Sequence, residues 1–197
     1  MSKSTTAYSI SMNKNMETIL SRLKVECNNP TMYSLSPNLS QYIKTGIELR
    51  KEVNCYTYKS TRNFELFYED RTGNEYTNNK LYVANSRNTK ETLKESVAFC
   101  FAIANILASF PDKFNVVLSI SGEEFIVSFY CVRDSEQWLA EDLDSYLDEA
   151  IIVITINWNG CKITEVLHPF LLFGYCCYRS PHRFRSWSSY CLYVIAE

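Results

Sequence analysis

Carboxylate side chains are concentrated between Arg133 and Ala150, where the sequence DSEQWLAEDLDSYLDE contains seven acidic residues and no basic one. Two carboxyl groups act as general acid and base in glycoside hydrolysis when an apolar cleft raises the pKa of one of them. Acidic side chains on the outer face of a helix stay solvated and titrate normally. The pattern therefore does not favour a glycosidase-like pair.

The apolar residues of the same segment predict the element that carries these carboxylates. After the N-cap candidate Asp134, their spacing predicts a helix over residues 135–150 with its apolar side toward the core. We interpret the acidic side as a docking surface for a basic partner, such as a nuclease whose cleft carries Lys and Arg. An ordinary solvated helix face explains the same pattern. The candidate partner-binding residues on this helix are Glu136, Glu141, Asp142, Asp144 and Asp148.

A second group of candidate binding residues lies in YRSPHRFRSW, residues 178–187, where arginines alternate with aromatic residues. This composition binds phosphates and stacks on bases, and it is also enriched at protein interface hot spots. Three arginines in a chain of net charge −2 favour a protein contact, or pairing with the acidic helix, over nucleic acid. Arg183 and Arg185 are the candidates from this segment.

Eight cysteines and two histidines supply the remaining candidates for nucleophilic or metal chemistry. Cys176 and Cys177 are adjacent, and no CxxC pair exists, so the spacing does not favour a zinc site. A Cys–His pair such as Cys176 with His168 lacks any local signature, and we expect His168 and His182 to pack in the interior. The five glycines are dispersed and do not build a phosphate-binding loop. We expect no catalytic residue, no metal and no cofactor.

Hydrophobic periodicity and turn residues predict the surrounding elements. Helices are expected at 16–25, 39–43 and 88–107, the last capped by Asn88 and Glu91 and apolar nearly all round. Strands are expected at 52–60, 64–70, 80–85, 113–122, 124–132 and 150–158, with further edge strands at 161–170 and 191–197. The first three strands are expected to form an antiparallel meander, and Gly122 to form the tight turn of a hairpin.

Length and composition bound the fold class. A chain of 197 residues with 46% hydrophobic residues has ample material for one core. We predict a flexible N-terminus over residues 1–14 and a single α+β domain over residues 15–197. Its two layers are a mostly antiparallel sheet and helices packed against it. The first fifteen residues are polar, so we expect no secretory signal, and the longest apolar run, residues 97–107, is too short to span a bilayer. We therefore expect a cytoplasmic protein with reduced cysteines and no membrane contact.

Residues 125–154 resemble a region of bacterial immunity proteins that neutralise toxins of contact-dependent growth inhibition and related polymorphic toxins. The resemblance covers a strand that ends in an arginine, an E-x-W-L pair, a D-L-x-x-Y step and an E-A-hydrophobic run. The residues concerned are Arg133, Glu136, Trp138, Leu139, Asp142, Leu143, Tyr146, Glu149, Ala150 and Ile151. The Cys-rich and aromatic C-terminal stretch has no counterpart in the resemblance, which leaves the type of toxin open.

The resemblance implies a protein that binds one cognate toxin domain, often a nuclease, in the cytosol and blocks its active site, with no catalytic residue of its own. Two alternatives remain open. One is a phage- or host-encoded inhibitor or adaptor that binds a protein of a defence system. The other is a hydrolase that depends on Cys or Glu.

Overall fold

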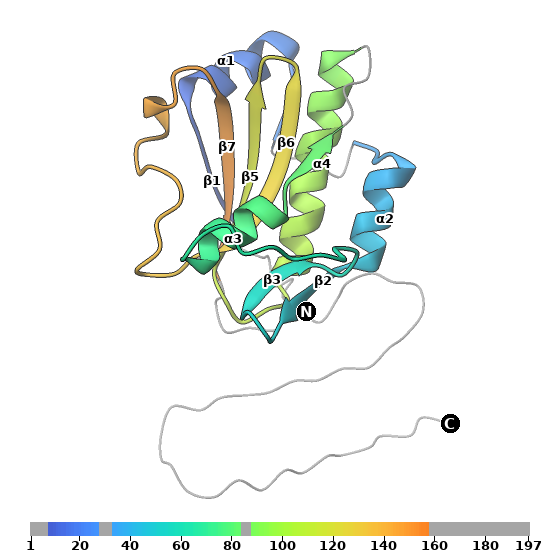
Figure 1. Ribbon diagram of the computed structural model, residues 1–197. Helices are drawn as coiled ribbons and strands as arrows, with labels where there is room; N and C mark the ends of the chain where they lie inside the picture. Colours follow the sequence, from blue (N-terminus) through green and yellow to red (C-terminus); the bar gives the residue numbers. More distant parts are fainter. Residues whose placement is uncertain (1–7, 28–32, 84–87, 158–197) are drawn as a thin grey trace, which may run out of the picture. The chain divides into compact units, whose positions relative to one another are not determined.

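The computed structural model describes residues 8–27, 33–83 and 88–157, which form an α+β fold (Figure 1). A five-stranded antiparallel sheet has the order β1-β7-β5-β6-β4, and a second sheet pairs β2 with β3. The strands are β1 (Tyr8–Met12), β2 (Ile47–Arg50), β3 (Cys55–Tyr58), β4 (Leu81–Val83), β5 (Phe114–Ser121), β6 (Glu124–Cys131) and β7 (Ala150–Ile156). The helices are α1 (Lys14–Leu23), α2 (Pro37–Thr45), α3 (Arg71–Asn78) and α4 (Thr89–Leu107), with a short 3-10 helix at Leu143–Ser145. The predicted α+β class with a mostly antiparallel sheet is confirmed.

The β5–β6 hairpin forms the centre of the large sheet, as its apolar sequence predicts. The strands pair from Phe114 opposite Cys131 to Ser121 opposite Glu124. The turn between them places Gly122 at φ +59°, a left-handed conformation that glycine adopts without strain. Strand β7 pairs with the other edge of β5, so β5 is hydrogen-bonded on both sides.

Helix α4 covers one face of this sheet and contacts β5, β6 and β7. The side chain of Asn88 accepts hydrogen bonds from the N–H groups of Lys90 and Glu91, which confirms the predicted N-cap. The predicted stripe of apolar residues is buried, and it consists of Leu93, Val97, Phe101, Ala104 and Leu107. Helix α2 packs against α4, which explains why α4 is apolar on several sides. Within the described part of the chain, no helix is long and apolar enough to cross a membrane.

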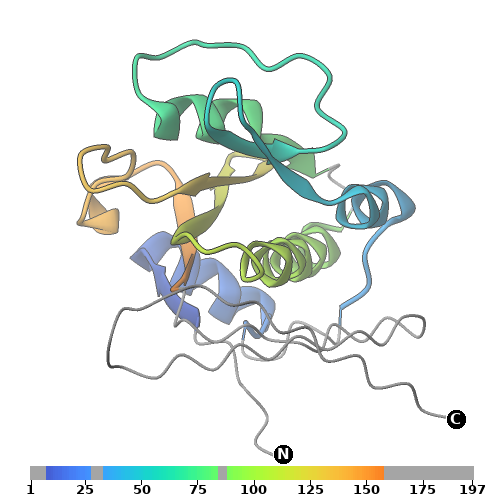
Figure 2. The same cartoon turned by 90° about the horizontal axis from the view of Figure 1, so that it is seen from below.

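Alternate residues of the same strands form a second, smaller apolar cluster on the opposite face. Val117, Tyr130, Ile151 and Val153 are buried there. Their cover consists of Tyr76 from α3 and of side chains from the segment between β6 and β7. Figure 2 shows α3 and α4 on opposite sides of the sheet. This second face positions the candidate site.

The expectation of a flexible N-terminus over residues 1–14 is wrong from Tyr8 onward. Residues Tyr8–Met12 form β1, which pairs with β7 as an edge strand. The side chain of Asn13 then caps α1 by accepting from Met16 N, and it also accepts from Ile151 N at 2.9 Å. The polar sequence of residues 8–12 does not predict this strand, because the contacts that order it come from β7, far along the chain.

The predicted three-stranded meander is also wrong. Strand β3 pairs with β2, while β4 pairs with β6 of the large sheet. Residues 64–70 form a loop in place of the predicted strand, and the helix α3 follows it from the N-cap Asp70. Glycine, threonine and asparagine are weak helix formers, so local propensity hides α3. Tertiary contacts of its buried polar residues stabilise it instead.

The predicted helix over residues 135–150 does not form. This segment is irregular except for the 3-10 helix at Leu143–Ser145. Its predicted core residues Trp138, Leu139, Leu143 and Tyr146 do pack on the sheet, but Leu147 is 80% exposed. Contacts with distant parts of the chain override the helical spacing. The candidate edge strands at 161–170 and 191–197 lie outside the described residues.

Candidate partner-binding site

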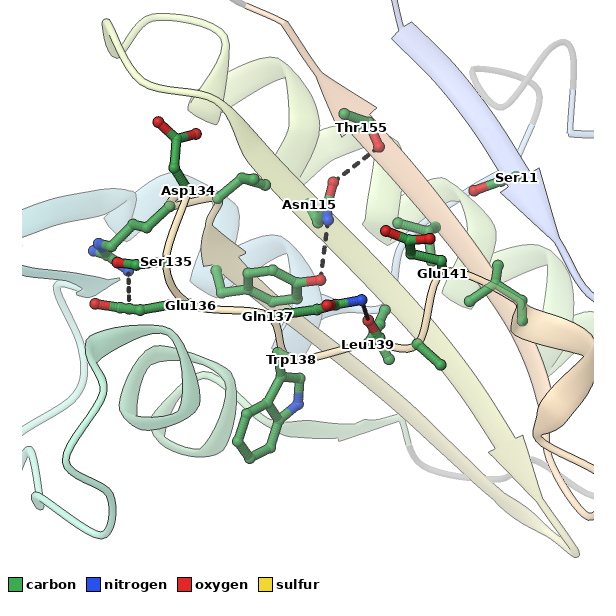
Figure 3. A pocket seen from close by; sticks show the side chains of 16 residues that line it. Ser11, Asn115, Asp134, Ser135, Glu136, Gln137, Trp138, Leu139, Glu141 and Thr155 are labelled. Carbon is green, nitrogen blue, oxygen red and sulfur yellow. Dashed lines mark hydrogen bonds and ion pairs between the residues drawn. The ribbon is translucent and has the colours of Figure 1, made fainter.

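A groove of about 530 Å³ lies between the second face of the sheet and the segment that follows β6 (Figure 3). We call residues 134–149 the acidic segment. Its first half forms one wall of the groove, which includes Trp138, Leu139 and Glu141. Ser11 from β1 and Thr155 from β7 line the opposite side. The groove is thus bounded by residues from both ends of the described chain.

A chain of neutral hydrogen bonds forms the floor of the groove. Thr155 Oγ1 donates to Asn115 Oδ1 at 2.8 Å, and Asn115 Nδ2 donates to the hydroxyl oxygen of Tyr130 at 2.9 Å. Burial raises the pKa of Tyr130, although its hydrogen bond with Asn115 opposes the shift. The phenol therefore stays protonated at neutral pH. These groups can orient a bound side chain, but none of the three is an activated nucleophile.

Beside the groove, a buried ion pair joins the two sheets to α3. Arg133 Nη2 and Nη1 bind the two carboxylate oxygens of Glu75 at 2.7 and 3.0 Å. The same carboxylate accepts from Tyr56 N of β3 and Cys131 N of β6, both at 2.7 Å. Burial raises the pKa of Glu75, while Arg133 and the two N–H groups act against that shift. The Glu75 side chain has no exposed surface, which makes it a structural link rather than an acid for a substrate.

Glu136, the first predicted docking residue, belongs to this network. Its Oε2 accepts from Thr72 N at 2.8 Å and from Thr72 Oγ1 at 2.6 Å, at the N-terminal turn of α3. Arg133 lies 3.7 Å from the same oxygen and Arg71 3.5 Å from the other. Burial alone would raise the pKa of Glu136, but these hydrogen bonds and cations lower it. Its side chain is 13% exposed, and its contacts within the chain make Glu136 a residue that positions the acidic segment.

The other four acidic candidates divide into two pairs. Asp144 accepts from Lys14 N at 2.8 Å and pairs with Lys14 Nζ at 3.0 Å, and these contacts lower its pKa. Asp142 caps the 3-10 helix by accepting from Asp144 N at 3.0 Å. Glu141 and Asp148 are exposed to solvent. Arg183 and Arg185 lie outside the described residues.

Sequence reasoning missed a second surface, which we call the aromatic loop, residues 64–70 (FELFYED). Its side chains Leu66, Phe67 and Tyr68 are 66%, 54% and 44% exposed. The rings of Tyr68 and Trp138 pack edge to face with centroids 5.1 Å apart, which brings the aromatic loop against the acidic segment. The signal in the sequence is three successive apolar residues between acidic ones, a pattern that does not alternate as a half-buried strand would.

The model of the Uncharacterized protein PM0498 family matches residues 11–166. The chain belongs to this family. None of the curated proteins and none of the solved structures compared with it matches the chain. The family match spans the groove, the buried ion pair, the aromatic loop and the acidic segment.

A second cavity, of about 710 Å³, lies between α2 and β4. Apolar and hydroxyl side chains dominate its lining, which includes Leu39, Tyr42 and Leu81. Its charged residue Glu95 accepts a hydrogen bond from Ser36 N at 2.6 Å and so holds the start of α2.

The thiols of the described residues do not form a nucleophilic site. Burial raises the pKa of Cys55 to about 11 and that of Cys131 to about 12, and it also raises the pKa of Cys27 and Cys100. A thiol must be deprotonated to attack a substrate or to bind a metal. Among the described residues, no group of three His, Cys, Asp or Glu side chains is placed to hold a metal ion.

Proposed function

We propose that the chain is an immunity-type protein that binds a cognate toxin domain, a nuclease, in the cytosol of the producing cell and blocks its active site. One observation carries the proposal. The aromatic loop and the acidic segment adjoin each other, and they contain three and seven acidic residues respectively, with no Lys or Arg. Exposed aromatic groups beside carboxylates suit a partner whose apolar surface is surrounded by basic side chains.

The charge of this surface fits the chemistry of a nuclease. An enzyme that cleaves nucleic acid binds phosphates with Lys and Arg, so its cleft carries positive potential. A carboxylate surface speeds association with such a cleft and selects against acidic partners. Glu141 and Asp148 are exposed and suited to this role, whereas Glu136 holds the surface in place.

The resemblance of residues 125–154 to immunity proteins also supports the proposal. Those residues do not form the helix that their spacing predicted. The support therefore comes from the residues that this segment has in common with immunity proteins, and from the surface that Trp138 and the acidic side chains form. It does not come from a helix.

The test is co-expression with the polypeptide encoded next to the gene for this chain. We expect that polypeptide to arrest growth alone, the chain to restore growth, and the two to co-elute on size exclusion. The Glu141→Lys, Asp148→Lys double variant should protect less. The control is Glu26→Lys, Glu124→Lys, which makes the same charge change at exposed positions outside the acidic segment and the aromatic loop. Growth arrest that persists with the wild-type chain, together with separate elution, would rule out the proposal.

A further inference from the structure

The tip of the aromatic loop presents apolar side chains to solvent in a fixed backbone. Leu66 and Phe67 are 66% and 54% exposed, yet the peptide groups on either side of them are bound by side chains of α3. Asn78 Oδ1 accepts from Glu65 N at 2.9 Å, and Asn78 Nδ2 donates to Glu65 O at 2.8 Å. The side-chain amide of Asn78 thus binds both backbone groups of Glu65, as the backbone of a neighbouring strand would.

Asn74 holds the other half of the loop in the same way. Its Oδ1 accepts from Phe67 N at 2.7 Å and from Tyr68 N at 3.0 Å. Its Nδ2 donates to Tyr68 O at 2.8 Å and to Asp70 O at 2.7 Å. The Asn74 side chain is buried, and its four hydrogen bonds satisfy it fully. The backbone of the loop is thus fixed independently of any partner.

Aromatic contacts fix both ends of the loop. Arg50 lies over the ring of Phe64 at 5.9 Å, and Tyr68 packs against Trp138. Among the apolar residues of the loop, Leu66 and Phe67 at the tip are the two most exposed. The side chains of buried Asn74 and half-buried Asn78 thus fix a loop whose most apolar residues stay in water, which holds those residues ready for another molecule.

We infer that Leu66 and Phe67 are the apolar anchor of the interface and enter a pocket rimmed by basic side chains on the toxin domain. This inference rests on the proposed function. A fixed loop loses little conformational freedom on binding, so burial of its tip contributes to affinity with a small entropic cost. Anchors of this kind account for most of the affinity of an interface, while surrounding charges set association and specificity.

Charge complementarity identifies the occupant. Glu65 and Glu69 are exposed and flank the tip, and the acidic segment adjoins it. A second copy of this chain would bring like charges together, and an anionic lipid surface would repel the same carboxylates. A protein surface with an apolar pocket and a basic rim would bury the apolar tip and pair with the carboxylates that flank it.

The test measures binding of the full chain to the toxin domain from the neighbouring gene by titration calorimetry. We expect Leu66→Ser, Phe67→Ser to weaken binding at least about 30-fold, the lower limit for loss of one strong anchor. The heat-capacity change on binding should become less negative, because less apolar surface is buried. Tyr82→Ser, an exposed aromatic position of similar exposure (65%) on β4, is the matched control and should leave affinity unchanged. Circular dichroism and thermal unfolding verify that each variant folds.

The possible outcomes separate the two proposals. If the wild-type chain does not bind the toxin domain, both the proposed function and the anchor are overturned. If the wild type binds and the tip variant binds equally well, the anchor alone is overturned. Sedimentation that shows a dimer lost on the tip substitution, or flotation with anionic vesicles that depends on the tip, would assign the loop to another occupant and overturn the anchor as well.

Discussion

Replacing Glu75 by Gln is expected to lower the free energy of unfolding by about 3–5 kcal/mol, the usual cost of leaving a buried ion without its partner. The Glu75 carboxylate receives four donors, two from Arg133 and one each from Tyr56 N and Cys131 N. Glutamine has the same size but a single acceptor oxygen, so its NH₂ group must face at least one of these donors. Among the described residues, Arg133, 13% exposed, then keeps one carboxylate partner, the more distant Glu136, together with neutral acceptors such as Thr72 Oγ1 and Cys131 O. Since a domain has about 5–15 kcal/mol of stability, the loss is a large fraction of the total.

Urea unfolding followed by circular dichroism measures this loss. The chain offers a matched control in Glu91, which pairs with Lys94 at 2.8 Å at the surface and is 56% exposed. Glu91→Gln should change stability by less than about 1 kcal/mol. In a double-mutant cycle with Arg133→Met, the two losses should be non-additive by about 0.5–3 kcal/mol. A Glu75→Gln loss as small as that of Glu91→Gln would refute the buried, fully bonded pair.

Three further predictions concern the same face of the sheet. Gly73→Ala places a Cβ 2.6 Å from Trp138 Cζ3, so it should displace the indole, cost about 1–3 kcal/mol and change the tryptophan emission spectrum. Because the folded pKa of Glu136 is lowered, its carboxylate contributes stability above the unfolded value of about 4.3, and that contribution disappears as pH falls through the lower folded value. Glu136→Gln should therefore be less stable than the wild type at neutral pH, with the difference shrinking in acid. Cys55 and Cys131 should resist alkylation at about pH 8 in the folded protein, read by peptide mass mapping, because the thiolate is the reactive form.

Each of these predictions has a contrary result. An unchanged emission spectrum and stability in Gly73→Ala would mean that Trp138 does not pack on α3. A stability difference for Glu136→Gln that stays constant from neutral pH to about pH 2 would contradict its lowered pKa. Alkylation of Cys55 or Cys131 at the rate of the same thiol in the unfolded chain would contradict their burial.

Local patterns were sufficient for the elements that bury their own apolar residues. Helix α4 followed from its cap at Asn88 and its apolar stripe, and β5, β6 and β7 followed from β-branched and aromatic runs. In these elements, local propensity and tertiary burial agree. The edge strand β1 did not follow, because its five residues gain order from pairing with β7.

The candidate site was the part that the sequence predicted least well. The acidic segment has helical spacing, but Glu136 binds the start of α3 and Asn13 binds the carbonyl oxygen of Glu149 at 2.7 Å. The aromatic loop was predicted as a strand, but the amide groups of Asn74 and Asn78 bind its backbone in place of a partner strand. Such contacts join residues far apart along the chain or depend on side-chain geometry. Hydrophobic periodicity gives no information about either, so it could not predict the site.

The rate of association with the toxin domain from the neighbouring gene, measured by stopped flow over a range of salt, tests most directly whether the acidic segment and the aromatic loop form the docking surface. The account predicts fast association at low salt that slows steeply as ions screen the carboxylates. Glu141→Lys, Asp148→Lys should reduce both the rate and its salt dependence. A rate that is independent of salt and unaffected by this charge reversal would contradict the account.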